Sequence, residues 1–203
     1  MSPGRWMAAL KSGWLHHHAL LVAALLLSAP AAHAFNIEHS EARYADKHFQ
    51  YELVVTLNAP IDRVDAVLRD YADYPSLNHR ILSANVLDRP APDVVILETK
   101  VEVCFGWFCR NVTRVERVQE SKHALVAVAD PARSDVKFSE TRSELTLEHH
   151  GTTRVKYVTN VVPGFWVPSV GGRRMLLRTL ENETRDLFMN VEQKALGPVA
   201  TSP

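Results

Sequence analysis

The chain has 203 residues, of which 46% are hydrophobic and 23% are charged, and its 23 basic residues equal its 23 acidic residues in number. This length suffices for one domain with a sizeable core. Because nucleic-acid binding depends on neutralising phosphates with an excess of Lys and Arg, the balanced charge argues against a nucleic-acid partner.

The first 34 residues have the pattern of a secretory signal peptide. They contain Arg5 and Lys11 but no acid, followed by an apolar run from Ala19 to Ala29 and small residues ending at Ala34. This order predicts export and cleavage after Ala34. An uncleaved membrane anchor is the alternative, but the apolar run is shorter than the roughly 20 residues that a spanning helix needs. We therefore expect a periplasmic or secreted protein.

The rest of the chain is predicted to hold one domain at residues 48–196, preceded by a polar lead-in at 35–47 and followed by a disordered tail at 197–203. Period-two alternation and β-rich composition between turn signals predict strands. The seven expected strands span residues 49–58, about 80–88, 93–104, 107–118, 123–129, 136–148 and 153–162. Their short connections favour antiparallel neighbours.

Helical periodicity appears twice. Residues 61–71 repeat apolar side chains at helical spacing after Pro60, and a short second turn or helix is expected to reach Leu77. A long amphipathic helix is expected to stop before Gly197. Its apolar stripe contains Leu177, Leu180, Thr184, Leu187, Val191 and Ala195. Several strands have one apolar face, and we expect this long helix to cover it.

Cys104 and Cys109 are the only cysteines. In an exported protein two nearby cysteines usually pair, and here they fall on opposite strands of a predicted hairpin around Phe105-Gly106. A zinc site normally needs four ligands, and a redox pair is more often C-x-x-C. We predict a disulfide, with free thiols or an intermolecular bond as the alternatives.

Two stretches carry a resemblance to a known family. They are LNAPIDRVDAVLRDYADYPSLNHRI (residues 57–81) and VPGFWVPSVGGRRMLLRTLENETRDLFMNVE (residues 162–192). Together with the order of elements, they resemble the START-like (SRPBCC) superfamily, in its polyketide cyclase/dehydrase or coenzyme Q-binding branch. The resemblance implies an α+β helix-grip fold, in which a curved seven-stranded antiparallel sheet wraps around the long C-terminal helix. Two short helices would follow strand 1, and an apolar cavity would lie between sheet and helix.

The candidate ligand-binding residues combine aromatic rings, hydroxyl groups and one face of the last helix. They are Tyr71, Tyr74, His79, Thr99, Trp107, Tyr157, Thr159, Trp166, Leu177, Leu180 and Thr184. Trp107 and Trp166 occupy predicted loops, where such rings line a cavity mouth or rest at a lipid interface; core packing is the alternative for both. We identify no catalytic residue and no metal-binding motif.

The resemblance, the signal-peptide pattern, and the strands and helix that each have one apolar face predict an exported protein that binds a hydrophobic small molecule or lipid in the cavity. We expect it to need no cofactor. Contact with a membrane surface and a monomeric state are also expected. The first alternative is a cyclase/dehydratase-type enzyme that uses the same cavity, which requires a buried acid or base. The second is a periplasmic adaptor that binds a protein partner through its tryptophans.

Overall fold

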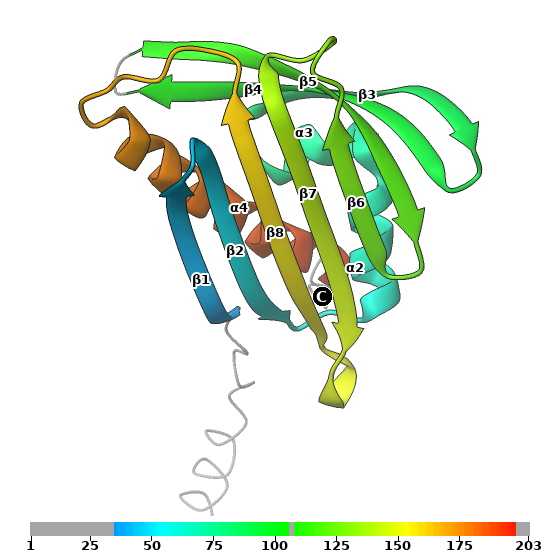
Figure 1. Ribbon diagram of the computed structural model, residues 1–203. Coiled ribbons are helices and arrows are strands. Elements are labelled where there is room, and N and C mark those ends of the chain that lie inside the picture. The colour runs from blue at the N-terminus through cyan, green and yellow to red at the C-terminus, as the bar shows by residue number, and fades with distance from the viewer. Residues whose placement is uncertain (1–34, 106–107, 198–203) are drawn as a thin grey trace, which may run out of the picture. The chain divides into compact units, whose positions relative to one another are not determined.

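A computed structural model describes residues 35–105 and 108–197 of the chain. Within them, eight antiparallel strands form one sheet in the order β1-β2-β8-β7-β6-β5-β4-β3 (Figure 1). The strands are β1 (Asn36–Ala45), β2 (His48–Leu57), β3 (Ile81–Ala91), β4 (Val94–Phe105), β5 (Phe108–Ser121), β6 (Ala124–Ala129), β7 (Val136–Leu147) and β8 (Thr153–Pro163). The helices are α2 (Ile61–Arg69), the 3₁₀ turn η1 (Tyr71–Asp73), α3 (Tyr74–Leu77), the 3₁₀ turn η2 (His149–Gly151) and α4 (Gly172–Leu196).

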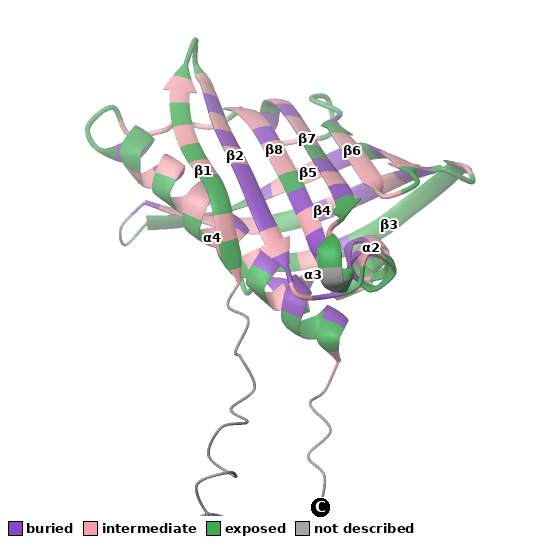
Figure 2. Ribbon diagram, turned by 90° about the horizontal axis from the view of Figure 1, so that it is seen from below, coloured by how far each residue is buried: buried purple, intermediate pink, exposed green. Residues whose placement is uncertain are grey.

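The expected strand number was wrong, because the segment 35–47 forms β1 rather than a lead-in. Ala45 pairs with His48 across a two-residue turn, whose residues Asp46 and Lys47 have φ values of 51° and 69°. Two successive positive φ angles match the right-handed twist of a tight hairpin. The strand adds an edge to the sheet, and Figure 2 shows it alternating between exposed and intermediate residues beside the buried β2.

The short helices also differ in place from the expectation. They follow the second strand, and the second of them consists of the η1 turn and the four-residue helix α3. Helix α2 begins after Pro60 and buries Val64 and Leu68. The antiparallel sheet and the long C-terminal helix are confirmed.

Helix α4 contacts strands β1, β2 and β4 and helices α2 and α3. Its buried face includes Leu176, Thr184, Phe188, Val191 and Ala195. Leu177, which the spacing placed on the covered stripe, is only half-buried. Phe188 was not among the residues of the predicted stripe, although it is fully buried.

The predicted disulfide is present. Cys104 of β4 and Cys109 of β5 are cross-strand partners, and their sulfur atoms lie 2.03 Å apart. The bond joins the two strands next to residues 106–107, which lie outside the described part of the chain. Within residues 35–105 and 108–197, no helix is long and apolar enough to cross a membrane.

Phe188 provides a test of the packing between α4 and the sheet. It is fully buried, and its ring centroid lies 5.5 Å from that of Tyr157 in β8. We expect Phe188→Ala to lower the free energy of unfolding by about 3 kcal/mol, because it removes a large buried ring and leaves a void. Urea denaturation followed by circular dichroism measures the change.

The neighbouring exposed residue Met189 is the matched control. Met189→Ala should change the stability by less than about 0.5 kcal/mol. Equal losses for the two variants would contradict the packing described for α4.

Candidate functional site: a cavity between the sheet and α4

A cavity of about 260 Å³ lies between the inner face of the sheet and α4. One side of it is closed by the main core cluster, in which Phe188, Val191 and Ala195 of α4 pack among residues of β2, β8 and α2. Another side is closed by a separate cluster of Phe49, Phe105 and Leu176. The cavity thus lies between two apolar clusters through which α4 packs on the sheet, and Leu180 of α4 packs against both.

Most of the predicted binding residues line this cavity. Those that do are Tyr71, Tyr74, Thr99, Tyr157, Thr159, Leu180 and Thr184. They come from the η1 and α3 segment, from strands β4 and β8, and from one face of α4. The structure therefore brings distant parts of the sequence together around one apolar space; their contact with a ligand stays a prediction.

The remaining predicted residues are not brought together there. His79 is exposed, while its neighbours Asn78 and Arg80 line the cavity. Trp166 projects from the loop before α4 and is 71% exposed. Leu177 packs with the cluster around Phe49 and does not line the cavity. Trp107 lies outside the described residues.

Two charged residues of the cavity wall, Arg114 and Glu116, were missed by the sequence reasoning. Both belong to β5 and alternate with Val112 and Val118, so all four side chains share the inner face. The Arg114 Nη2 and Glu116 Oε2 atoms lie 3.6 Å apart. The signal in the sequence that could have identified them is the alternation of β5, because Arg114 and Glu116 occupy inner-face positions between Val112 and Val118.

The polar groups beside this ion pair are incompletely matched. Ser139 donates a hydrogen bond from Oγ to Glu116 Oε1 at 3.4 Å. The Thr99 hydroxyl and the Arg114 Nε are buried without a hydrogen-bond partner among the described residues. Thr99 and Arg114 are cross-strand partners, so their polar groups lie on neighbouring strands of the same wall. A buried polar atom without a partner costs about 1–3 kcal/mol, and a ligand acceptor can satisfy such donors.

A second polar group borders the cavity near the start of β3. Arg80 forms ion pairs with Glu102 of β4 and, at 3.5 Å, with Glu183 of α4. Asn78 donates a hydrogen bond to the Glu183 carbonyl oxygen at 3.0 Å. These contacts connect the α3 segment, the sheet and α4, and therefore fix the helix relative to this part of the wall.

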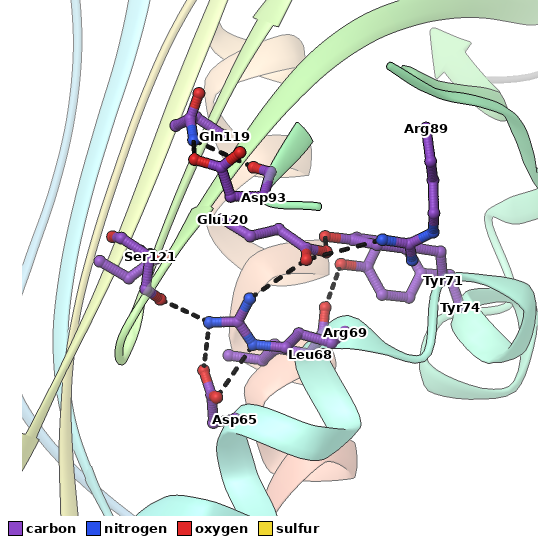
Figure 3. A network of polar contacts seen from close by, with 11 residues as sticks. Asp65, Leu68, Arg69, Tyr71, Tyr74, Arg89, Asp93, Gln119, Glu120 and Ser121 are labelled. Atoms are coloured by element: carbon purple, nitrogen blue, oxygen red, sulfur yellow. Dashed lines mark hydrogen bonds and ion pairs between the residues drawn. The ribbon is translucent and has the colours of Figure 1, made fainter. Parts of the chain in front are cut away.

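Figure 3 shows the polar network that holds the two cavity-lining tyrosines of the helical segment. The Tyr71 hydroxyl donates a hydrogen bond to Glu120 Oε1 at 2.6 Å, and the Tyr74 hydroxyl donates one to the Leu68 carbonyl oxygen at 2.7 Å. Arg69 lies 3.5 Å from Glu120 through its Nη1 atom and also bonds Asp65. Glu120, near the end of β5, thus anchors the segment from α2 to α3 to the sheet.

Burial keeps the cavity tyrosines protonated. Desolvation raises the pKa of Tyr74 and Tyr71, and the hydrogen bond to Glu120 raises the pKa of Tyr71 further. Burial also raises the pKa of Tyr157, against the opposing positive charge of Arg114. These phenols can donate hydrogen bonds at neutral pH but do not supply a phenolate base.

One group of residues in the described chain has metal-ligand spacing, formed by Glu102, Cys104 and Cys109. Its two sulfur atoms are bonded to each other. Because zinc is bound by thiolates and not by a disulfide, these residues do not form a metal site in this state.

Neither a scan of protein families nor a search of curated proteins finds a match to the chain. Solved structures do match. A Streptomyces aromatase/cyclase aligns with a TM-score of 0.62 and 16% identity over 75% of this chain and 99% of its own. A START superfamily protein from Mycobacterium smegmatis aligns with a TM-score of 0.58 and 19% identity over 71% of this chain and 98% of its own.

A STAR-related lipid transfer protein from Xanthomonas axonopodis aligns with a TM-score of 0.56 and 12% identity, over 80% of this chain and 98% of its own. At these identities the likeness concerns the arrangement of the backbone. Together with the bent antiparallel sheet and the gripped C-terminal helix, it shows that the chain has the START-like (SRPBCC) helix-grip fold.

Proposed function

We propose that this protein is an exported binding protein that holds one hydrophobic small molecule or a lipid chain in the cavity between the sheet and α4. The observation that carries the proposal is an apolar space of about 260 Å³ with a few polar groups in its wall. Ligand pockets commonly combine an apolar lining with a small number of such groups. The similar solved structures named for aromatase/cyclase and lipid transfer support a role in binding a hydrophobic ligand.

The size of the cavity limits the ligand. Its 260 Å³ lies just below the roughly 300–1,000 Å³ that is usual for pockets of drug-sized ligands. This favours a single compact molecule or one acyl chain over a complete two-chain phospholipid. Affinity would come mainly from buried apolar area, at about 25 cal/mol per Å².

The polar part of the wall supports a ligand with an acceptor group at one end. The Thr99 hydroxyl and the Arg114 Nε are unpartnered donors in the described wall, and Tyr157 lines the same space. A carbonyl, hydroxyl or carboxyl oxygen of the ligand would satisfy them, while its apolar part packs on Leu180 and Leu187 of α4.

Filling the cavity tests this proposal. Ala127 of β6 lines the cavity, whereas its neighbour Val128 is exposed. We expect Ala127→Trp to weaken the binding of a fluorescent fatty-acid probe by at least about tenfold, because the indole occupies the ligand's space. Val128→Trp adds the same ring to the outer face and should leave the affinity unchanged. Unchanged binding by folded Ala127→Trp would refute the cavity as the binding site.

Thr99→Val separates ligand recognition from folding. In the empty protein it removes a buried hydroxyl without a partner, so we expect it to raise the free energy of unfolding by about 1 kcal/mol. If the ligand accepts a hydrogen bond from Thr99, the same variant should weaken binding by about tenfold. Thermal unfolding measures the change in stability, and titration with the fluorescent probe measures the change in affinity. A gain in stability with unchanged probe affinity would show that the ligand makes no hydrogen bond with the Thr99 hydroxyl.

Glu116 supports a second candidate function, a cyclase/dehydratase-type reaction in the same cavity. It is a buried carboxylate in the wall, 3.6 Å from Arg114. Such a carboxylate can move a proton on a bound reactive chain. Under this alternative, Glu116→Gln should lower the turnover of a short poly-β-ketone thioester by at least about a hundredfold while probe binding persists. Mass spectrometry of the products measures this turnover. Absence of turnover by the unmutated protein would contradict the cyclase/dehydratase alternative.

A further inference from the structure

Exposed apolar side chains gather at one end of the structure, where the β4–β5 hairpin and the loop between β8 and α4 meet. Val170 and Trp166 of the loop are 91% and 71% exposed, and Phe108 at the start of β5 is 55% exposed. Among the other large hydrophobic residues described, Leu147 at the far end of β7 is 62% exposed and Leu196 at the end of α4 is 50% exposed. We call Phe108, Trp166 and Val170, with Arg110, Arg173 and Arg174, the tip surface.

Side-chain contacts join the two parts of the tip surface. The Phe105 and Phe165 ring centroids lie 6.5 Å apart, which places the loop against the hairpin. The Arg110 guanidinium carbon lies 4.6 Å from the centroid of Phe165. Figure 1 shows the end of β4 and the start of β5 at the same side of the molecule as the loop that leads into α4. The disulfide between Cys104 and Cys109 ties the hairpin directly behind Phe108.

The charge of this end differs from that of the whole chain. The chain has equal numbers of basic and acidic residues, yet residues 163–178 contain three arginines and no acid. In the hairpin, the acid beside the disulfide is Glu102, and it is paired with Arg80. Arg173 stacks on Tyr44, with its guanidinium carbon 4.6 Å from the ring centroid. Within the described residues, neither Arg110, Arg173 nor Arg174 forms an ion pair with a carboxylate.

The tip surface combines exposed apolar side chains with arginines that have no carboxylate partner among the described residues, and this combination matches the chemistry of an anionic lipid surface. Aromatic and aliphatic side chains enter the boundary between headgroups and acyl chains, and arginines bind the negative surface. A guanidinium held on an aromatic ring is weakly hydrated and keeps its donors free for a phosphate.

We infer that the tip surface docks the protein onto an anionic membrane, with Trp166 and Val170 inserted and the arginines at the headgroups. This deepens the proposed function and rests on it in one respect. Phe165 and Leu176 line the cavity and also belong to the apolar cluster behind the tip surface. A docked protein would therefore face the membrane with the cavity end that lies behind this surface.

Vesicle binding tests the inference. The probe is a vesicle of equal parts phosphatidylglycerol and phosphatidylcholine, compared with pure phosphatidylcholine, and the protein is used as recovered from an exporting host with its N-terminus read by mass spectrometry. We expect co-sedimentation with the anionic vesicles that weakens as salt is raised. Trp166→Ala and Val170→Ser should each lower the partition coefficient, the former by about tenfold. The double variant Arg173→Ser/Arg174→Ser should lower it by about 25-fold, at about fivefold per arginine.

Matched controls come from the other side of the molecule. Leu147→Ala removes a comparably exposed side chain, and Arg117→Ser removes an exposed arginine of β5; both should change the partition coefficient by less than about twofold. Circular dichroism checks that every variant is folded, and Val170→Ser serves where a larger change disturbs packing. Binding that is absent, independent of lipid charge, or equally affected by the controls would overturn the inference.

Two further outcomes separate this inference from the proposed function. If the protein binds the fatty-acid probe but not the vesicles, the proposed ligand-binding function stands and the docking surface is refuted. If it binds the vesicles through the tip surface but not the probe, the docking surface stands and the proposed ligand-binding function is refuted. Trp166-dependent crosslinking to a protein in the cell, without vesicle binding, would assign the surface to a protein partner and overturn the membrane inference.

Discussion

The edge-on contact between Phe188 of α4 and Tyr157 of β8 limits how closely the helix approaches the sheet. Towards the C-terminus, the smaller residues Val191 and Ala195 complete a closely packed cluster. Towards the N-terminus, Leu176 packs with Phe49 and Phe105 in a second cluster, and Leu180 packs against both clusters. Glu181 and Arg185 of α4 also contact Ser40 of the edge strand β1. The cavity therefore lies where these contacts hold α4 against the inner face of the sheet and the lining side chains leave space unfilled.

The polar groups of the cavity wall are hard to explain by stability alone. Replacing a buried ion pair by apolar side chains is often neutral or stabilising, so Arg114 and Glu116 gain the protein little by pairing inside an apolar space. The unpartnered hydroxyl of Thr99 on the adjacent strand adds to the cost. The other residues of the β5 inner face, Val112 and Val118, are the apolar choice that folding favours. Polar groups that disfavour the empty state but match a ligand acceptor are consistent with a binding role.

Much of the fold could be predicted because hydrophobic periodicity is a local property of strands and of α4. Strand β1 was not predicted, for two physical reasons. A bulge between Ile37 and His39 interrupts the alternation of its side chains. Its tight turn consists of Asp46 and Lys47 and lacks the glycine that usually indicates a positive φ. In the site, Thr99 and Thr159 were found through their strand faces, whereas Arg114 and Glu116 were missed because charged side chains are rarely buried and their type does not indicate a cavity wall. His79 is exposed although its neighbours Asn78 and Arg80 line the cavity, because sequence proximity to a cavity residue does not determine side-chain direction.

The cavity is closed at its two ends by different forces. Near α2 and α3, Glu120 accepts a hydrogen bond from Tyr71 and pairs with Arg69 and Arg89, and these directional contacts require fixed geometry. Near the β8–α4 loop, Phe165 rests on Phe105 and beneath Arg110, and such ring contacts tolerate sliding at small cost. The disulfide keeps the β4–β5 hairpin intact beside this loop. An opening at the Phe165 end therefore breaks fewer directional interactions than one at the Glu120 end, and it leaves the polar part of the wall in place.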